Sequence, residues 1–151
     1  MFQEFEPHFG FLLTDHNFVV AEREKLDSFD FRHVVYHSAQ CRVKVGLDRG
    51  TVYILLAHPD WEPAYWIDIS TVVSFLTQGR VDDVCERYDV RFERESPYFE
   101  RIDSQASKLS LALRDYLPDI CLLFANMPVE RVRSELGAYG IERMERRAGL
   151  T

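Results

Sequence analysis

Histidine is the side chain that most readily moves protons or binds metals near neutral pH. This sequence has five: His8, His16, His33, His37 and His58. His33 and His37 fall on one side of a predicted strand, but their spacing separates them by about 13 Å, whereas a metal ion holds its ligands at about 2 Å. His33 and His58 could meet only across strands. We therefore predict no metal or cofactor site and interpret these residues as partly exposed histidines of a sheet.

Cysteine is the next candidate, as a nucleophile beside a histidine and an orienting acid. Cys41, Cys85 and Cys121 are an odd number without CxxC spacing, which argues against a disulfide framework or a zinc knuckle. Cys41 falls on the buried side of a predicted hairpin and Cys121 in an apolar helical segment, so both are interpreted as core. Free cysteines indicate a reducing compartment, and the cytoplasm is the expected location.

Neighbouring carboxylates occur as Asp60 with Glu62 and as Asp82 with Asp83. Such pairs can perform general acid–base catalysis, but on loops and helix starts they are more often solvated or capping groups. The sequence has no glycine-rich phosphate loop and no HExxH, GxSxG or EF-hand pattern. No catalytic residue is predicted, and the interpretation leans away from an enzyme.

Residues 58–66 combine two prolines with aromatic and acidic side chains. Large rigid rings beside negative charge are typical of interface hot spots that bind arginine- or lysine-rich partners. Alternatively the tryptophans cover the sheet edge, which suits Trp66 better, so Trp61 is expected to be exposed. The predicted partner-binding residues are Asp60, Trp61, Glu62, Asp82, Asp83 and Glu86.

Charge is distributed unevenly along the chain, whose net value is −7. Residues 1–30 and residues 54–89 each contain seven acids and two basic residues, whereas residues 31–53 contain four basic residues and one acid. An acidic surface repels phosphate backbones and favours basic partners, so nucleic-acid binding is not expected. Simple solubility is the alternative interpretation of this charge.

A β-hairpin over residues 41–57 must position the loop that follows it. Apolar and polar residues alternate from Cys41 to Leu47 and again from Val52 to Leu56, the pattern of strands with one buried face. Gly50 supplies the positive φ of a tight turn. The second strand is apolar on both sides and is expected to lie centrally in its sheet.

The preceding residues are expected to complete an antiparallel meander. Residues 31–38 alternate as a strand, and short polar turns favour antiparallel pairing of sequential strands. Residues 1–9 predict a short helix ended by Gly10. Residues 11–21 are interpreted as a strand, a turn and a second extended piece, and residues 22–30 as a polar loop.

The later residues predict helices. Asp68 is an N-cap for a helix whose apolar residues recur at helical spacing from Ile69 and which ends at Gly79. The charged residues 81–95 are expected to form a surface helix or a partly ordered arm. Pro97 opens the longest helical pattern.

That pattern is expected to break or kink at Pro118. A last helix begins near Pro128, with arginines facing outward. Its inward residues are predicted to be Val129, Val132, Leu136, Tyr139 and Met144.

These elements predict an α+β fold, with an antiparallel β-meander sheet early in the chain, helices packed on one face and a helical C-terminal half. The length of 151 residues suits a single domain over residues 1–151, with residues 128–151 as a candidate helical extension. The acidic N-terminal residues do not resemble a signal peptide, and no apolar stretch is long enough for a membrane span. A soluble cytoplasmic protein is expected.

One resemblance can be stated. The pattern of Val45, Asp48-Arg49-Gly50, Val52 and Ile54, followed by Trp66-x-Asp68-Ile69-x-x-Val72-x-x-Phe75-Leu76, resembles small bacterial α+β proteins, some of which are similar to immunity proteins of polymorphic-toxin systems. Residues 113–124 are similar to the closing helix of such chains. The resemblance covers about half the sequence and carries no catalytic residues. It implies a non-enzymatic, protein-binding role.

Three functions follow as hypotheses. The first is a protein-binding domain that inhibits a basic partner by covering its site. The second is a small-molecule-binding or enzymatic domain with a pocket between sheet and helices, using His33, His37 or His58. The third is a homodimer formed through a sheet edge or the last helix.

Overall fold

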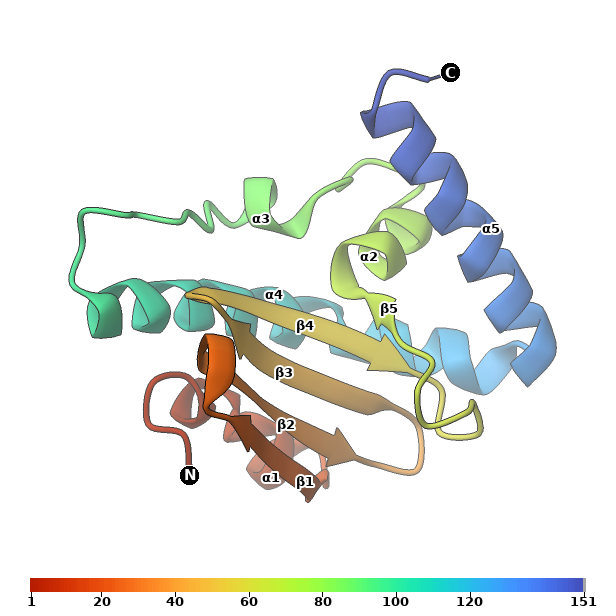
Figure 1. Cartoon of the computed structure of the whole chain (residues 1–151). Coiled ribbons are helices and arrows are strands. Elements are labelled where there is room, and N and C mark those ends of the chain that lie inside the picture. The colour runs from red at the N-terminus through yellow and green to blue at the C-terminus, as the bar shows by residue number, and fades with distance from the viewer. Residues whose placement is uncertain (151) are drawn as a thin grey trace.

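Five antiparallel strands form a single sheet in the computed structural model, which describes residues 1–150 apart from the side chain of Phe29. The strands are joined in sequence order, so the sheet is a meander (Figure 1). They are β1 (Val19–Leu26), β2 (Phe31–His37), β3 (Arg42–Asp48), β4 (Thr51–Ala57) and β5 (Ile67–Asp68). The predicted antiparallel meander is confirmed.

The longer helices follow the sheet in the chain, whereas two short helical elements precede it. The short elements are η1 (Glu6–Phe9), α1 (Phe11–Asp15), η2 (Ser28–Asp30) and α3 (Val84–Arg87), and the longer ones are α2 (Ile69–Thr77), α4 (Tyr98–Asn126) and α5 (Val129–Arg147). Early strands and late helices confirm the predicted α+β class. None of the helices in residues 1–150 has the length and apolar character needed to cross a membrane.

The β3–β4 hairpin is the best-predicted element. Gly50 has φ +86° in its turn, as the sequence indicates. Gln105 of α4 fastens this turn, because its side chain accepts from the Val52 N–H and donates to the Gly50 carbonyl, both at 2.9 Å. β4 lies between β3 and β5, although β5 pairs with it at only two positions.

One face of the sheet packs on helices. Alternate residues of β2, β3 and β4, such as Val34, Val45 and Ile54, are buried there in one cluster with Leu109 and Leu113 of α4. Helix α4 runs behind the strands in Figure 1, and α2 and α5 gather beyond the β5 edge. The cluster extends to Val132 and Leu136 of α5, so two of the five residues predicted to face inward there are fully buried.

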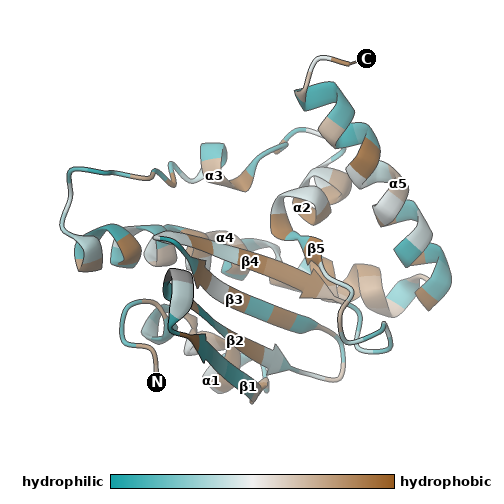
Figure 2. Ribbon diagram, in the orientation of Figure 1, coloured by the Kyte–Doolittle hydropathy of each residue, from teal (hydrophilic) through white to brown (hydrophobic). Residues whose placement is uncertain are grey.

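The prediction for the N-terminal region is wrong in part. The predicted first strand of residues 11–21 begins as helix α1, and Gly10 has right-handed φ and ψ rather than a left-handed cap. The predicted polar loop of residues 22–30 is mostly β1. β1 is an edge strand exposed on both faces, so it has no alternation of buried and exposed residues to reveal it. Figure 2 shows it as hydrophilic.

Two predictions for the C-terminal half are also wrong. The break predicted at Pro118 does not occur: α4 continues through it, and Pro118 lies on the exposed side of the helix, where a missing backbone hydrogen bond faces water. The alternative, a kink, stays a prediction. Met144 is exposed and Arg143 is buried, the reverse of the expectation. The cause is residue Asp82, whose backbone carbonyl accepts a hydrogen bond from Arg143 at 2.8 Å.

Candidate functional site

No long helix covers the sheet face opposite α4 in the described part of the chain, and only the short η2 lies at one end of it (Figure 1). Successive side chains of a strand point to opposite faces, so the side chains that do not enter the core lie on this one. Antiparallel sheets can leave such a face exposed to solvent. We call it the open face and define it by Glu22, Glu24, His33, Val35, Arg42, Lys44, Tyr53 and Leu55 of β1–β4, together with Trp66, which lies against Arg42 and Lys44.

A row of residues crosses the open face in register. Glu24 pairs with His33, His33 with Gly46, and Gly46 with Tyr53. Gly46 has no side chain, and the Tyr53 ring lies over it. Burial raises the pKa of Tyr53, and the charges of Asp48 and Glu24 raise it further. Tyr53 is therefore a neutral hydroxyl at physiological pH.

Gly46→Ala is expected to destabilise the fold by about 1–3 kcal/mol, because its Cβ would overlap the Tyr53 ring. Urea unfolding of both single variants and the double variant would measure this. In the Tyr53→Ala background the same change should cost little, since alanine suits a strand better than glycine by about 0.5–1 kcal/mol. An equal cost in both backgrounds would contradict the assigned packing.

Two glutamates of β1 converge on one imidazole of β2. The His33 Nε2 lies 3.0 Å from Glu22 Oε2 and 3.6 Å from Glu24 Oε2. The His33 side chain is only 8% exposed, whereas Glu22 and Glu24 are 53% and 45% exposed. The His33 Nδ1 is buried without a hydrogen-bond partner. These are the side chains of the open face that could hold a metal ion.

Glu22 and Glu24 are not among the site residues that the sequence predicts, because residues 22–30 are expected to form a loop. The signal was present in the alternation of Glu22 and Glu24 with Arg23 and Lys25. In a strand, period-two alternation places the acidic residues on one face and the basic residues on the other.

Trp66 anchors the other side of the open face. The guanidinium carbon of Arg42 and the ammonium of Lys44 each lie 4.7 Å from the centre of its ring. A cavity of about 330 Å³ opens here, with His37, Lys44 and Trp66 among its lining residues. Burial lowers the pKa of Lys44, although the charges of Glu22 and Glu24 act against this.

Arg42 holds the loop of residues 58–66 in place. It is buried, and its guanidinium donates to the backbone carbonyls of His58, Trp61 and Glu62 at 3.2–3.3 Å. No carboxylate of residues 1–150 forms an ion pair with it. Burial accordingly lowers the pKa of Arg42. Arg42 thus joins several backbone carbonyls of this loop and also lies over the ring of Trp66.

The expected exposure of Trp61 is wrong. Its side chain packs against Phe124 and Tyr65, it is 5% exposed, and its indole N–H donates to the Val129 carbonyl at 3.4 Å. Trp61 thus covers the core between α4 and the start of α5, and Trp66 is the tryptophan of the open face. Trp66 is partly buried and packs against the core, in agreement with its expected place over the sheet, whereas Trp61 is more buried than expected.

The acids beside Trp61 differ in their surroundings. Glu62 is held by Arg133 at 2.7 Å, whereas Asp60 is 75% exposed and its carboxylate lies 4.0 Å from the ring of His58. The partner-binding role assigned to Asp60, Trp61 and Glu62 stays a prediction.

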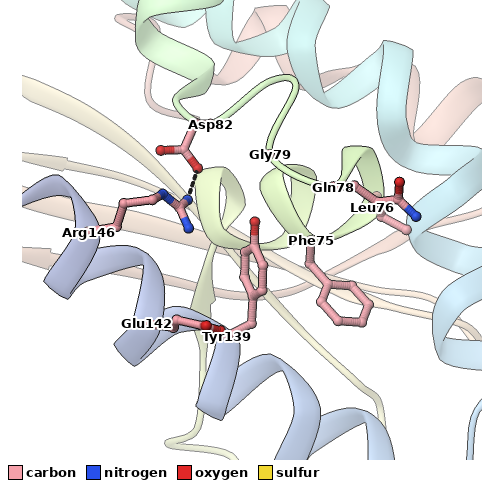
Figure 3. A pocket seen from close by; sticks show the side chains of 8 residues that line it. All are labelled: Phe75, Leu76, Gln78, Gly79, Asp82, Tyr139, Glu142 and Arg146. Atoms are coloured by element: carbon pink, nitrogen blue, oxygen red, sulfur yellow. Dashed lines mark hydrogen bonds and ion pairs between the residues drawn. The ribbon is translucent and has the colours of Figure 1, made fainter. Parts of the chain in front are cut away.

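The second predicted group meets the arginines of α5. Arg147 contacts Asp82, Asp83 and Glu86 at 3.0–3.2 Å. Arg146 contacts the Asp82 carboxylate at 2.6 Å, as Figure 3 shows. A cavity of about 860 Å³ lies beside this contact, and it is lined by Phe75, Leu76, Gln78, Gly79, Asp82, Tyr139, Glu142 and Arg146.

The ion pairs of Asp82 affect its ionisation. Burial alone would raise the pKa of Asp82, but hydrogen bonds from Ser74, Arg147 and Arg146 outweigh it, so the pKa lies below its ordinary value. A lowered folded pKa gives stabilisation that is present above the unfolded pKa and lost as pH falls through the folded one. The Asp82 carboxylate therefore stabilises the contact with α5 at neutral pH. A partner-binding role for Asp82, Asp83 and Glu86 also stays a prediction.

The cysteines are poorly suited to nucleophilic chemistry. Burial raises the pKa of Cys41 and Cys121. Burial, with the nearby charges of Asp83 and other acids, raises the pKa of Cys85 to about 11. Because the thiolate is the reactive form, a raised pKa lowers the nucleophilicity of each thiol near neutral pH.

The histidines have separate neighbours. His8 contacts Asp103 at 2.7 Å, and His58 packs against the rings of Trp61 and Phe124. Only His33 belongs to a group of three metal-ligating side chains in the described part of the chain.

Comparison of the chain with protein-family models, with curated proteins and with solved structures finds no match.

Proposed function

We propose that this chain is a protein-binding domain that receives a basic segment of its partner along β1 and the adjoining open face. The role is that of an inhibitor which covers its partner, as the resemblance to immunity proteins implies. The observation that carries the proposal is the character of β1. It is an eight-residue edge strand, exposed on both faces, with Glu22 and Glu24 on the open side.

An edge strand offers its unpaired backbone N–H and C=O groups to another chain. In residues 1–150, β1 pairs with β2 alone, so its outer edge is available. A partner strand added there forms main-chain hydrogen bonds, and its side chains give specificity. Lysine or arginine opposite Glu22 and Glu24 would form favourable cross-strand pairs.

The acids of residues 82–86 support this choice by contrast. Asp82, Asp83 and Glu86 already contact arginines of α5. A basic partner would have to displace those arginines first. Glu22 and Glu24 form no ion pair with an arginine or lysine in residues 1–150; they contact the His33 imidazole, lie near the charge of Lys44, and stay about half-exposed.

Pairing of β1 with a second copy of itself is less favourable. A two-fold antiparallel pair that continues the open face sets Glu22 and Glu24 of the copies opposite one another. On the other face, the basic side chains Arg23 and Lys25 of one copy would lie beside those of the other copy. Like charges opposite each other destabilise strand pairs. A partner with complementary charge therefore suits β1 better than a homodimer.

The test is binding by charge-reversed variants. A partner captured by the tagged chain from lysate of its source is purified, and its affinity is measured by titration. Glu22→Lys with Glu24→Lys should weaken binding by about tenfold or more, because two attractive contacts become repulsive. Glu93→Lys with Glu95→Lys makes the same charge change between α3 and α4 and should bind normally.

A third double variant, Asp60→Lys with Glu62→Lys, tests the loop that the sequence favours. Loss of binding in this variant alone would move the site from β1 to the loop. Equal binding by all three would contradict a basic partner docked on acidic residues of either surface.

A ligand-binding role is the second candidate function. The cavity of about 330 Å³ on the open face supports it, because Lys44 and Trp66, which line it, suit an anionic planar ligand. A thermal shift caused by small aromatic carboxylates, and lost in Lys44→Met, would favour this function over protein binding.

A further inference from the structure

We propose that the open face holds a divalent transition-metal ion, bound by Glu22 and Glu24 of β1 and His33 of β2. The proposal departs from the sequence prediction, which considered only pairs of histidines. It depends on the pairing of β1 with β2, which places Glu24 directly opposite His33 and Glu22 opposite Val35. Glu22 and Glu24 are two residues apart, so their side chains leave the strand on the same face.

The distances suit a common ion. One ligand atom from each of the three side chains lies within 4.8 Å of the others. The imidazole Nε2 is 3.0 Å from one carboxylate and 3.6 Å from the other. Ligands bound tetrahedrally to zinc at about 2.1 Å lie about 3.4 Å from one another. Small rotations of two half-exposed glutamate side chains are enough to bring both onto one ion.

His33 is a buried ligand on which the two half-exposed glutamates converge. Its side chain is 92% buried by its neighbours, since only 8% is exposed, and its ring meets the edge of Phe31 with centres 6.0 Å apart. Its Nδ1 is buried and has no hydrogen-bond partner, so Nε2 is the nitrogen that meets polar groups. That nitrogen offers one hydrogen bond to two carboxylates. A divalent ion would contact all three groups at once and balance both negative charges.

The ligand set indicates the kind of ion. Imidazole nitrogen suits zinc and other first-row transition ions, whereas calcium and magnesium prefer oxygen ligands alone. Three protein ligands resemble zinc sites that keep an open coordination position. Because Glu22 and Glu24 are half-exposed, the ion could enter from solvent and the open position would face outward from the sheet.

The site does not require a protein partner and is tested with the metal alone. In one respect the metal site rests on the proposed function, because it would regulate partner binding. An ion on Glu22 and Glu24 would neutralise the charges that a basic partner needs, so the ion and the partner should compete for the same surface. Failure of metal binding would leave the partner test unaffected. Failure of partner binding would leave the metal test unaffected.

The experiment is a titration of the purified, metal-free full chain with ZnCl₂ by calorimetry, and with CoCl₂ by visible absorption. The expected result is one ion per chain, with a rise in melting temperature. Glu22→Gln and Glu24→Gln preserve shape and remove one charge each. Each should weaken zinc binding by about tenfold or more, since even outer-shell changes cost about 10–100-fold in affinity.

Glu142→Gln on α5 is the matched control and should bind zinc as the original chain does. Melting curves without metal establish that each variant is folded. Absence of zinc uptake by the original chain would overturn the proposal. Uptake that Glu22→Gln and Glu24→Gln leave unchanged would overturn it equally, because the ion would then lie elsewhere.

Discussion

Replacing Gln105 with leucine is expected to lower the free energy of unfolding by about 3 kcal/mol, because two buried backbone groups lose their only side-chain partner. The Gln105 amide accepts from the Val52 N–H and donates to the Gly50 carbonyl, both at 2.9 Å. Leucine has a similar volume, so the change leaves packing nearly intact. The loss should therefore report on the hydrogen bonds that join α4 to the hairpin turn.

Urea unfolding followed by circular dichroism measures this effect. Gln40→Leu is the matched control, since Gln40 is exposed in the β2–β3 turn, and it should change stability by less than about 0.5 kcal/mol. Equal stability of Gln105→Leu and Gln40→Leu would show that the turn does not depend on α4.

Replacing Arg42 with methionine is expected to cost about 3 kcal/mol, since hydrogen bonds from a charged donor contribute about 1.5–3 kcal/mol each and are partly recovered by water. The carbonyls of His58, Trp61 and Glu62 would lose their common donor. Trp66 would also lose a cation above its ring. The expected local result is faster hydrogen exchange of residues 58–66 and altered tryptophan fluorescence.

Arg42→Lys distinguishes geometry from charge. A lysine keeps the positive charge but cannot direct a planar fork at several carbonyls. It should therefore recover less than half of the lost stability. Full recovery by lysine would indicate that charge near Trp66, rather than the carbonyl contacts, holds the loop.

The sequence predicts the parts of the fold in which local pattern and tertiary packing agree. Val45 and Ile54 alternate with polar neighbours because one face of their strands is buried, and Gly50 marks the turn between them. Asp68 caps α2 as predicted, with its side chain accepting from the Ser70 N–H at 3.0 Å. β1 escapes prediction because an edge strand with both faces exposed carries no hydrophobic period.

The candidate site is harder to predict because its contacts join residues far apart in the chain. Asp82 contacts Arg146, which lies 64 positions later in the sequence, and no local pattern predicts that pairing. Trp61 is buried because the start of α5 covers it through Val129. Nothing within residues 58–66 distinguishes it from Trp66. The proximity of Glu24 to His33 can be predicted only when the register of β1 on β2 is known.

Hydrogen–deuterium exchange of the partner complex tests the proposed function most directly. Amides in Val19–Leu26 that point away from β2 are expected to exchange quickly in the free chain, because they have no strand partner there. On binding, a partner strand should slow their exchange, and Glu22 and Glu24 should lie within the protected segment. Protection confined to residues 58–66 or 82–86, with β1 unchanged, would contradict docking on the edge strand.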